Sequence, residues 1–177
     1  DLPIMPVDHP LCFFGPYEEF AGTGKEIGYP LLRDQGNSAY LRDTGDPATA
    51  EGGQIEWGYY EEKDPRLVHP KDLLEKGESH WSPSQRDLEM DQIIEPLEKA
   101  MELTPILGEL GWNEKHSFNG LLQVTADNGP SIGESPNTRG LWYAEAVWVK
   151  DAPGVAKLLV DMMTDGITET DIHSVDV

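Results

Sequence analysis

The sequence predicts an α+β fold, consisting mostly of an antiparallel sheet with flanking helices. In the first half of the chain, short segments that alternate apolar and polar residues are separated by Gly-rich turns, as antiparallel strands are. In the second half, two longer segments repeat apolar residues with the period of a helix. Strand-like segments also recur between these two helices, so helices and strands are not strictly alternating units of a parallel sheet.

Composition limits the kinds of partner that the chain can have. Its hydrophobic content of 38%, with five Trp and six Tyr, is typical of a folded protein. The formal net charge of -20 argues against nucleic acid and anionic membrane as partners, because phosphate binding needs a basic face. The single Cys12 excludes an internal disulfide and a multi-Cys zinc site. No apolar run approaches the roughly 20 residues of a membrane span.

The N-terminal part is predicted to form strands. Leu2–His9 alternates loosely and is interrupted by prolines, which favours an edge strand. The segments Pro30–Asp34 and Ser38–Arg42 flank the turn signal Gly36-Asn37 and together predict a β-hairpin. Gln54–Tyr60 alternates large apolar side chains with polar residues and glycine, the pattern of a half-buried strand.

Residues 15–30 are Gly-rich and are expected to form a loop. Within them, Gly22-Thr23-Gly24-Lys25 superficially matches a phosphate-binding loop. That motif needs a glycine five residues before its Gly-Lys and a Ser or Thr directly after it. Glu19 and Glu26 occupy those two positions, which argues against phosphate binding.

The first predicted helix begins at Ser82. Ser82 fits the N-cap, Pro83 the first helical position, and Gln85 the third, which completes a capping box. Pro96 is expected to kink or break this helix because it removes a backbone donor, and Pro105 is expected to end it. One apolar face is formed by Met90, Ile93, Ile94, Leu97 and Met101.

The C-terminal part is predicted to run strand, turn, strand, strand and helix. Asn119–Glu134 contains the first two strands and their turn. Leu141–Val149 holds a single charge, which favours a strand buried in a parallel or mixed sheet. Asp151 can cap the helix that follows, and Gly166 is suited to end it. The apolar face of that helix comprises Val155, Leu158, Leu159, Met162 and Met163.

The order of motifs near the C-terminus resembles the FAD module of dimethylglycine oxidases and dehydrogenases, within the sarcosine oxidase and D-amino-acid oxidase-like flavoproteins. Weaker similarity extends back through Gly58–Glu61 and Pro30–Tyr40 to Leu2–His9. The motifs are Phe118-Asn119-Gly120, Thr125–Pro130, Ile132–Ser135, and Leu141–Lys150 followed by Gly154–Lys157.

The resemblance implies a domain organisation. Residues 1–117 would belong to the substrate (cap) domain, and residues 118–177 would be the C-terminal segment of the FAD-binding domain. The N-terminal Gly-rich dinucleotide fold has no counterpart here, so we expect an internal fragment whose N-terminal FAD-binding half belongs to the same polypeptide. We expect that the fragment alone is inactive and does not retain FAD.

The resemblance also implies a function. The full-length protein would be an FAD-dependent amine oxidase or dehydrogenase that oxidises an N-methyl amine, such as dimethylglycine or sarcosine, by hydride transfer to flavin. A following domain in the family can bind tetrahydrofolate. The expected location is the cytoplasm or the mitochondrial matrix, and these 177 residues contain no targeting signal.

Site residues follow from the same resemblance. His9 and Tyr40 match active-site positions, where a histidine can set the protonation of the amine and a phenol can position the substrate. The segment Val147, Trp148, Val149 and Lys150 matches a flavin contact that leads into a helix N-terminus. Asp151 would oppose flavin reduction unless it caps that helix. The alternative is that all of these residues are structural. The remaining histidines lack metal-ligand spacing, and no metal site is expected.

Two other functions are compatible with parts of the sequence. The chain can be a non-enzymatic binding or structural domain derived from such a flavoprotein. Continuation of the native polypeptide on both sides into a Gly-rich dinucleotide fold would favour the enzyme over this alternative. An α/β hydrolase is disfavoured because no G-x-S-x-G nucleophile elbow is present.

Overall fold

The computed structural model describes residues 3–48, 52–61, 64–69, 71, 84–109, 111–113 and 115–175. The chain divides into two compact units, and each is described here by itself. The sheet unit comprises residues 8–66 and 71–121. The hairpin unit comprises residues 1–7, 67–70 and 122–177. The predicted boundary at residue 117 between a substrate domain and an FAD-binding domain remains a prediction.

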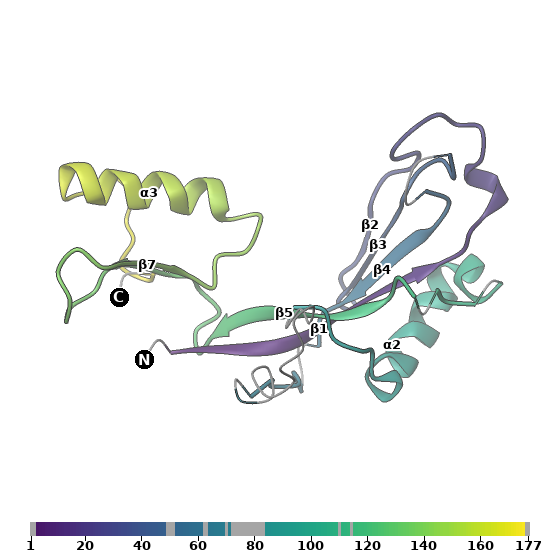
Figure 1. Ribbon diagram of the computed structural model, residues 1–177, viewed down its shortest axis with the longest axis horizontal. Helices are drawn as coiled ribbons and strands as arrows, with labels where there is room; N and C mark the ends of the chain where they lie inside the picture. Colours follow the sequence, from purple (N-terminus) through teal and green to yellow (C-terminus); the bar gives the residue numbers. More distant parts are fainter. Residues whose placement is uncertain are drawn as a thin grey trace. The chain divides into compact units, whose positions relative to one another are not determined.

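A five-stranded sheet with the order β2-β3-β4-β1-β5 forms the first architectural element (Figure 1). The pairs β2–β3, β3–β4 and β1–β4 are antiparallel, which confirms the predicted α+β class, the hairpin and the strand that follows it. The strands are β1 (Ile4–Phe14), β2 (Leu32–Asp34), β3 (Ala39–Asp43), β4 (Ile55–Tyr59) and β5 (Phe118–Thr125).

Strand β1 is not an edge strand, and that prediction was wrong. It continues to Phe14 and lies between β4 and β5. Alternate side chains along it, including Cys12 and Phe14, are buried in the core. Burial of these side chains outweighs the backbone donors that are missing at Pro6 and Pro10.

One face of the sheet packs against helix α2 (Met90–Leu103). From the helix, Ile93 and Ala100 are buried, with Leu97 partly buried beside them. From the sheet come Cys12, Phe14, Ala39, Leu41, Ile55, Trp57 and Tyr59. Of the predicted apolar face, Ile93, Leu97 and Met101 pack against the core, whereas Met90 and Ile94 are exposed, so the core-facing stripe is narrower than predicted.

The limits of α2 differ from those predicted. Ser82 and Pro83 lie outside the described residues, and the helix begins at Met90 with Glu89 at its N-cap, so Gln85 does not complete a capping box. Pro96 does not break the helix, which is continuous over 14 residues. Packing of the apolar stripe against the sheet compensates for the one backbone donor that proline removes. The helix ends before Pro105, as expected. Pro105 is the first residue of the short 3-10 helix η2 (Pro105–Gly108).

The loop that precedes the β2–β3 hairpin is fastened by two aspartates. The short 3-10 helix η1 (Glu18–Phe20) interrupts it. Asp43 accepts hydrogen bonds from the backbone N–H groups of Gly28 and Tyr29 at 2.6 and 2.9 Å. The N–H of Gly24, within the run that superficially matches a phosphate loop, donates to Asp46 at 2.7 Å. The acceptor of this backbone N–H is therefore a carboxylate of the chain itself.

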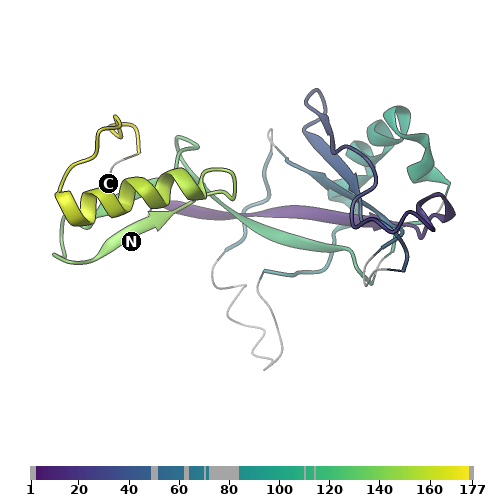
Figure 2. The ribbon, with the colours of Figure 1, turned by 90° about the horizontal axis from the view of Figure 1, so that it is seen from above.

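The hairpin unit contains the antiparallel pair β6 (Ser131–Glu134) and β7 (Trp142–Glu145), with helix α3 (Ala152–Asp165) lying along it (Figures 1 and 2). The predicted buried strand over Leu141–Val149 is wrong, because β7 holds four residues and Val149 is 93% exposed. Ala146 adopts φ 53°, a left-handed conformation that ends the strand.

Helix α3 begins and ends at the residues that the sequence predicted. Gly166 closes the helix with φ 74°, the left-handed C-cap that was predicted. Asp151 stands at the N-cap position, but its side chain makes no capping hydrogen bond. Neither α2 nor α3 is long and apolar enough to cross a membrane, and no other helix in the described part of the chain is.

Candidate active site

The sheet has a second, polar face opposite the core, and the candidate site lies on it. In the strand registers Arg33 stands opposite Tyr40, Tyr40 opposite Gly58, and Gly58 opposite Leu11. Cross-strand partners project from the same face of a sheet. The same alternation places His9, two residues before Leu11, on this face. Three strands therefore contribute a guanidinium, a phenol and an imidazole to the same face of the sheet.

His9 and Tyr40, which the sequence predicted separately, are in direct contact. The Nε2 atom of His9 lies 3.0 Å from the hydroxyl oxygen of Tyr40, a normal hydrogen-bond distance. The ring of Tyr60 packs against both, with centroid distances of 4.5 Å to His9 and 5.5 Å to Tyr40. Three aromatic rings thus form one cluster, and the catalytic roles of His9 and Tyr40 remain predictions.

Both members of the pair are neutral at physiological pH. Burial lowers the pKa of His9 to about 4, and the charge of Arg33 adds to this effect. Burial also raises the pKa of Tyr40 well above its ordinary value. The Tyr40 hydroxyl can therefore donate to an unprotonated His9 Nε2, leaving its oxygen free to accept a further hydrogen bond.

Two residues that the sequence did not single out fix this geometry. A side chain at Gly58 would collide with the ring of Tyr40, so glycine lets that ring lie across β4 towards β1. The guanidinium carbon of Arg33 lies 4.9 Å from the ring centroid of Tyr60, a cation–π contact. A glycine inside an alternating strand was the available signal for a close approach at position 58.

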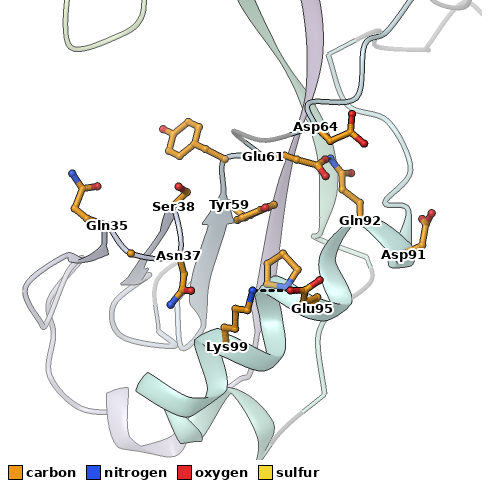
Figure 3. Close-up of a pocket in the computed structure, with 13 residues that line it drawn as sticks. Gln35, Asn37, Ser38, Tyr59, Glu61, Asp64, Asp91, Gln92, Glu95 and Lys99 are labelled. Atoms are coloured by element: carbon orange, nitrogen blue, oxygen red, sulfur yellow. Dashed lines mark hydrogen bonds and ion pairs between the residues drawn. The ribbon is translucent and has the colours of Figure 1, made fainter.

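A pocket of about 370 Å³ adjoins the cluster through Tyr60 (Figure 3). Its walls come from the β2–β3 turn, the end of β4 and the first turns of α2. Four acids line it, among them Glu95, whose carboxylate binds Lys99 at 2.7 Å. Neither His9 nor Tyr40 lines this pocket, so it is separate from their contact. The lining acids are Glu61, Asp64, Asp91 and Glu95.

The predicted flavin-contact segment lies in the hairpin unit. Trp148 Nε1 donates to the Gln123 carbonyl at 3.2 Å, and Lys150 Nζ lies 5.6 Å from the Trp148 ring centroid. Lys150 also binds the carboxylate of Asp151 at 2.6 and 2.8 Å. This pairing, rather than helix capping, offsets the negative charge at the start of α3.

The described histidines other than His9 form no metal site. His116 contacts Gln54, with 3.2 Å between Nδ1 and the amide nitrogen, and packs edge-on against Phe13. Among the described residues, no group of three or more His, Cys, Asp or Glu side chains is placed to hold a metal ion.

Comparison with known proteins finds dimethylglycine dehydrogenases among the relatives of this chain. No family model matches the chain. Mitochondrial dimethylglycine dehydrogenases from Mus musculus and Rattus norvegicus are each 25% identical over 99% of this chain. The chain spans 19% and 20% of their lengths, about a fifth of each.

Solved structures share the fold at lower sequence identity. L-proline dehydrogenase from P. horikoshii aligns with 99% of this chain at a TM-score of 0.67 and 19% identity. Glycine oxidase from Geobacillus kaustophilus and iminodiacetate oxidase from Chelativorans sp. BNC1 each align with 99% at a TM-score of 0.63, with 17% and 14% identity. The chain covers 39–40% of each of the three. The chain is therefore homologous to a segment of dimethylglycine dehydrogenase and has the fold of part of the D-amino-acid oxidase-like flavoenzymes.

Proposed function

We propose that this chain forms the substrate-binding part of an FAD-dependent oxidoreductase that oxidises an N-methyl amine of the dimethylglycine or sarcosine type. The observation that carries the proposal is the contact between His9 Nε2 and the Tyr40 hydroxyl. The two positions were selected by resemblance alone and lie far apart in sequence. Their meeting on the polar face of the sheet supports a shared role for the two side chains.

The pair can position the substrate amine. An N-methyl ammonium must lose its proton before the adjacent carbon can give up a hydride, because the nitrogen lone pair stabilises the iminium product. With its hydroxyl hydrogen directed to His9 Nε2, Tyr40 can accept a hydrogen bond from the substrate ammonium on its oxygen. The lowered pKa of His9 and the raised pKa of Tyr40 keep both side chains neutral, so the ammonium proton leaves to solvent while the pair holds the nitrogen in place.

The segment Val147–Lys150 is the part of the chain that would hold FAD, whose isoalloxazine ring accepts the hydride when bound. Its residues fit that group. Val149 is 93% exposed, and Trp148 and Lys150 offer an indole and a cation beside it. Helix α3 begins directly afterwards, and a helix N-terminus favours negative charge. The Lys150–Asp151 ion pair keeps the acid from opposing that effect.

The test uses the full-length protein that contains this chain. It should be purified and mixed anaerobically with dimethylglycine or sarcosine while flavin absorbance is followed. Bleaching of a stoichiometric flavin supports the proposal. A full-length protein that carries no flavin, or one whose flavin no N-methyl amine bleaches, would favour the alternative of a non-enzymatic domain. The isolated 177-residue chain should carry no stoichiometric flavin, and a yellow preparation would contradict its assignment as a fragment.

A further inference from the structure

Tyr60 lies in the middle of the aromatic cluster on the polar face of the sheet. It follows β4 directly and stands two residues after Gly58, so its side chain projects from the same face. Its backbone N–H donates to the carbonyl of Ser38 at 2.9 Å, which ties it to the β2–β3 turn. The backbone therefore fixes the place from which the Tyr60 ring extends.

The rings of Tyr60 and Tyr40 contact His9 in different ways. Tyr60 is stacked on the imidazole, with a centroid distance of 4.5 Å and an interplanar angle of 28°. This distance is at the short end of the range for aromatic pairs. The Tyr40 ring is farther away, with 6.0 Å between centroids, and its hydroxyl reaches the Nε2 atom instead. Tyr60 therefore covers a face of the imidazole, whereas Tyr40 contacts its edge.

The titratable and charged groups that face His9 come from the neighbouring strands. Tyr40 comes from β3, Tyr60 from the end of β4, and Arg33 from β2, where its guanidinium carbon lies 4.9 Å from the Tyr60 ring centroid. On β5, Gly120 lies next to the His9 carbonyl and brings no side chain. Burial is the largest cause that lowers the pKa of His9 to about 4, ahead of the charge of Arg33. The stacked ring of Tyr60 is part of that burial.

The charge on His9 decides the direction of its hydrogen bond with Tyr40. A neutral imidazole has one nitrogen that can accept a hydrogen bond, whereas an imidazolium donates from both. If His9 were protonated, Nε2 would donate to the Tyr40 oxygen and occupy one of its lone pairs. Less of that oxygen would then remain to accept a hydrogen bond from the substrate ammonium.

We propose that Tyr60 is a positioning residue for the reaction: its ring excludes water from a face of the His9 imidazole and so keeps Nε2 able to accept the Tyr40 hydroxyl hydrogen. This inference rests on the proposed function. Tyr60 does not have to touch the substrate in this role, because it acts through His9 and Tyr40. The stacked ring is responsible for the effect, and the Tyr60 hydroxyl is not.

The first test measures the ionisation of His9 in the full-length holoenzyme without substrate. An NMR titration of protein labelled at its histidine rings follows His9, whose signal is the one missing from His9→Gln. Tyr60→Ser and Tyr60→Asn remove the aromatic cover with side chains of two sizes, and Tyr60→Phe keeps the cover without the hydroxyl. Tyr29→Ser is the matched control, because Tyr29 is 54% exposed and its ring packs on Phe20.

We expect Tyr60→Ser and Tyr60→Asn to raise the midpoint of His9 from about 4 to about 6, close to that of an ordinary histidine. Tyr60→Phe and Tyr29→Ser should leave the midpoint near 4. An unchanged midpoint in both Tyr60→Ser and Tyr60→Asn would overturn the inference. An equal rise in Tyr60→Phe would also overturn it, because the ring would then not be the cover.

The second test measures the consequence for flavin reduction by dimethylglycine. The rate of each variant is divided by that of the wild type at the same pH, which cancels the ionisation of the amine itself. For Tyr60→Ser this ratio should be about tenfold lower at pH 5 than at pH 7, because a histidine with a midpoint of about 6 is mostly protonated at pH 5. For Tyr60→Phe the ratio should not change with pH.

A ratio for Tyr60→Ser that is independent of pH would show that Tyr60 does not act on the reaction through His9. Wild-type flavin that dimethylglycine fails to bleach would instead contradict the proposed function. The two failures are distinguishable, because the titration of His9 needs neither substrate nor turnover.

Discussion

The ring of Tyr40 occupies the space that a Cβ atom on Gly58 of the neighbouring strand would fill. This contact leaves no room for a side chain at position 58 and points the Tyr40 hydroxyl towards His9. The glycine is therefore part of the candidate site although it has no side chain to contribute. It determines whether the phenol and the imidazole can meet.

We expect Gly58→Ala to disrupt this meeting. The new methyl group collides with the Tyr40 ring and forces it to rotate, which breaks the hydrogen bond to His9 and costs about 1 to 3 kcal/mol in the free energy of unfolding. Flavin reduction and urea unfolding measure the two effects. Gly154→Ala in α3 is the control, since an added Cβ there meets nothing within 4 Å. Retention of wild-type reduction by Gly58→Ala would show that the Tyr40 orientation is not needed.

Tyr40→Phe removes the hydroxyl and keeps the ring. We expect flavin reduction by dimethylglycine in the full-length protein to slow by roughly 100-fold, because the hydroxyl that positions the substrate nitrogen is lost. The free energy of unfolding should fall by only about 1 kcal/mol, the value of one ordinary hydrogen bond. Stopped-flow absorbance gives the first quantity and denaturant titration the second. An unchanged reduction rate would remove Tyr40 from the chemistry.

His9 should titrate far below an ordinary histidine. Its pKa is lowered to about 4, chiefly by burial, so the folded state binds a proton less readily than the unfolded state. Between pH 6.5 and 4 the unfolded state therefore holds more protons, and the free energy of unfolding falls as the pH falls through that window. In His9→Gln this contribution to the pH dependence should disappear. An NMR titration of the His9 ring that gives a midpoint near 6.5 would contradict the assignment.

Asp8 and Arg86 form an ion pair on the sheet unit in which the Asp8 side chain is only 5% exposed. Burial raises the pKa of Asp8, and the charge of Arg86 opposes that rise. Arg86→Met leaves an uncompensated buried carboxylate, so we expect a loss of roughly 3 to 5 kcal/mol in the free energy of unfolding. Lys157→Met, which removes the surface pair with Asp161, should leave the free energy of unfolding nearly unchanged. Similar losses for the two variants would show that the Asp8 pair is effectively solvated.

Local sequence patterns correctly predicted those helices, strands and turns whose formation depends on residues that are close in sequence. The turn signal Gly36-Asn37 and the alternation in Gln54–Tyr60 correspond to the β2–β3 hairpin and β4. Gly166 closes α3 as its position suggested. His9 and Tyr40 were found through family resemblance. Their contact could not be deduced from local pattern, because it depends on how β1 and β3 each pair with β4.

The failures share a cause in tertiary packing. Pro96 lowers helix propensity, yet the stripe that includes Ile93 holds α2 against the sheet. The apolar run Leu141–Val149 indicated burial, yet the backbone turns at Ala146 and exposes Val149. The sequence did not predict the contact between Arg33 and the ring of Tyr60, because the two residues are remote in sequence.

The two faces of the five-stranded sheet have different roles. One packs against α2 and forms the core, and the other carries the candidate site. Substitutions on the helix-covered face change folding, whereas Arg33, Tyr40 and His9 lie on the other face and contribute little to the apolar core. Under the proposed function, substitutions at these three positions would therefore alter the candidate site while leaving the helix-covered core in place. Gly58 is the exception on this face, because its lack of a side chain is needed for the packing of Tyr40.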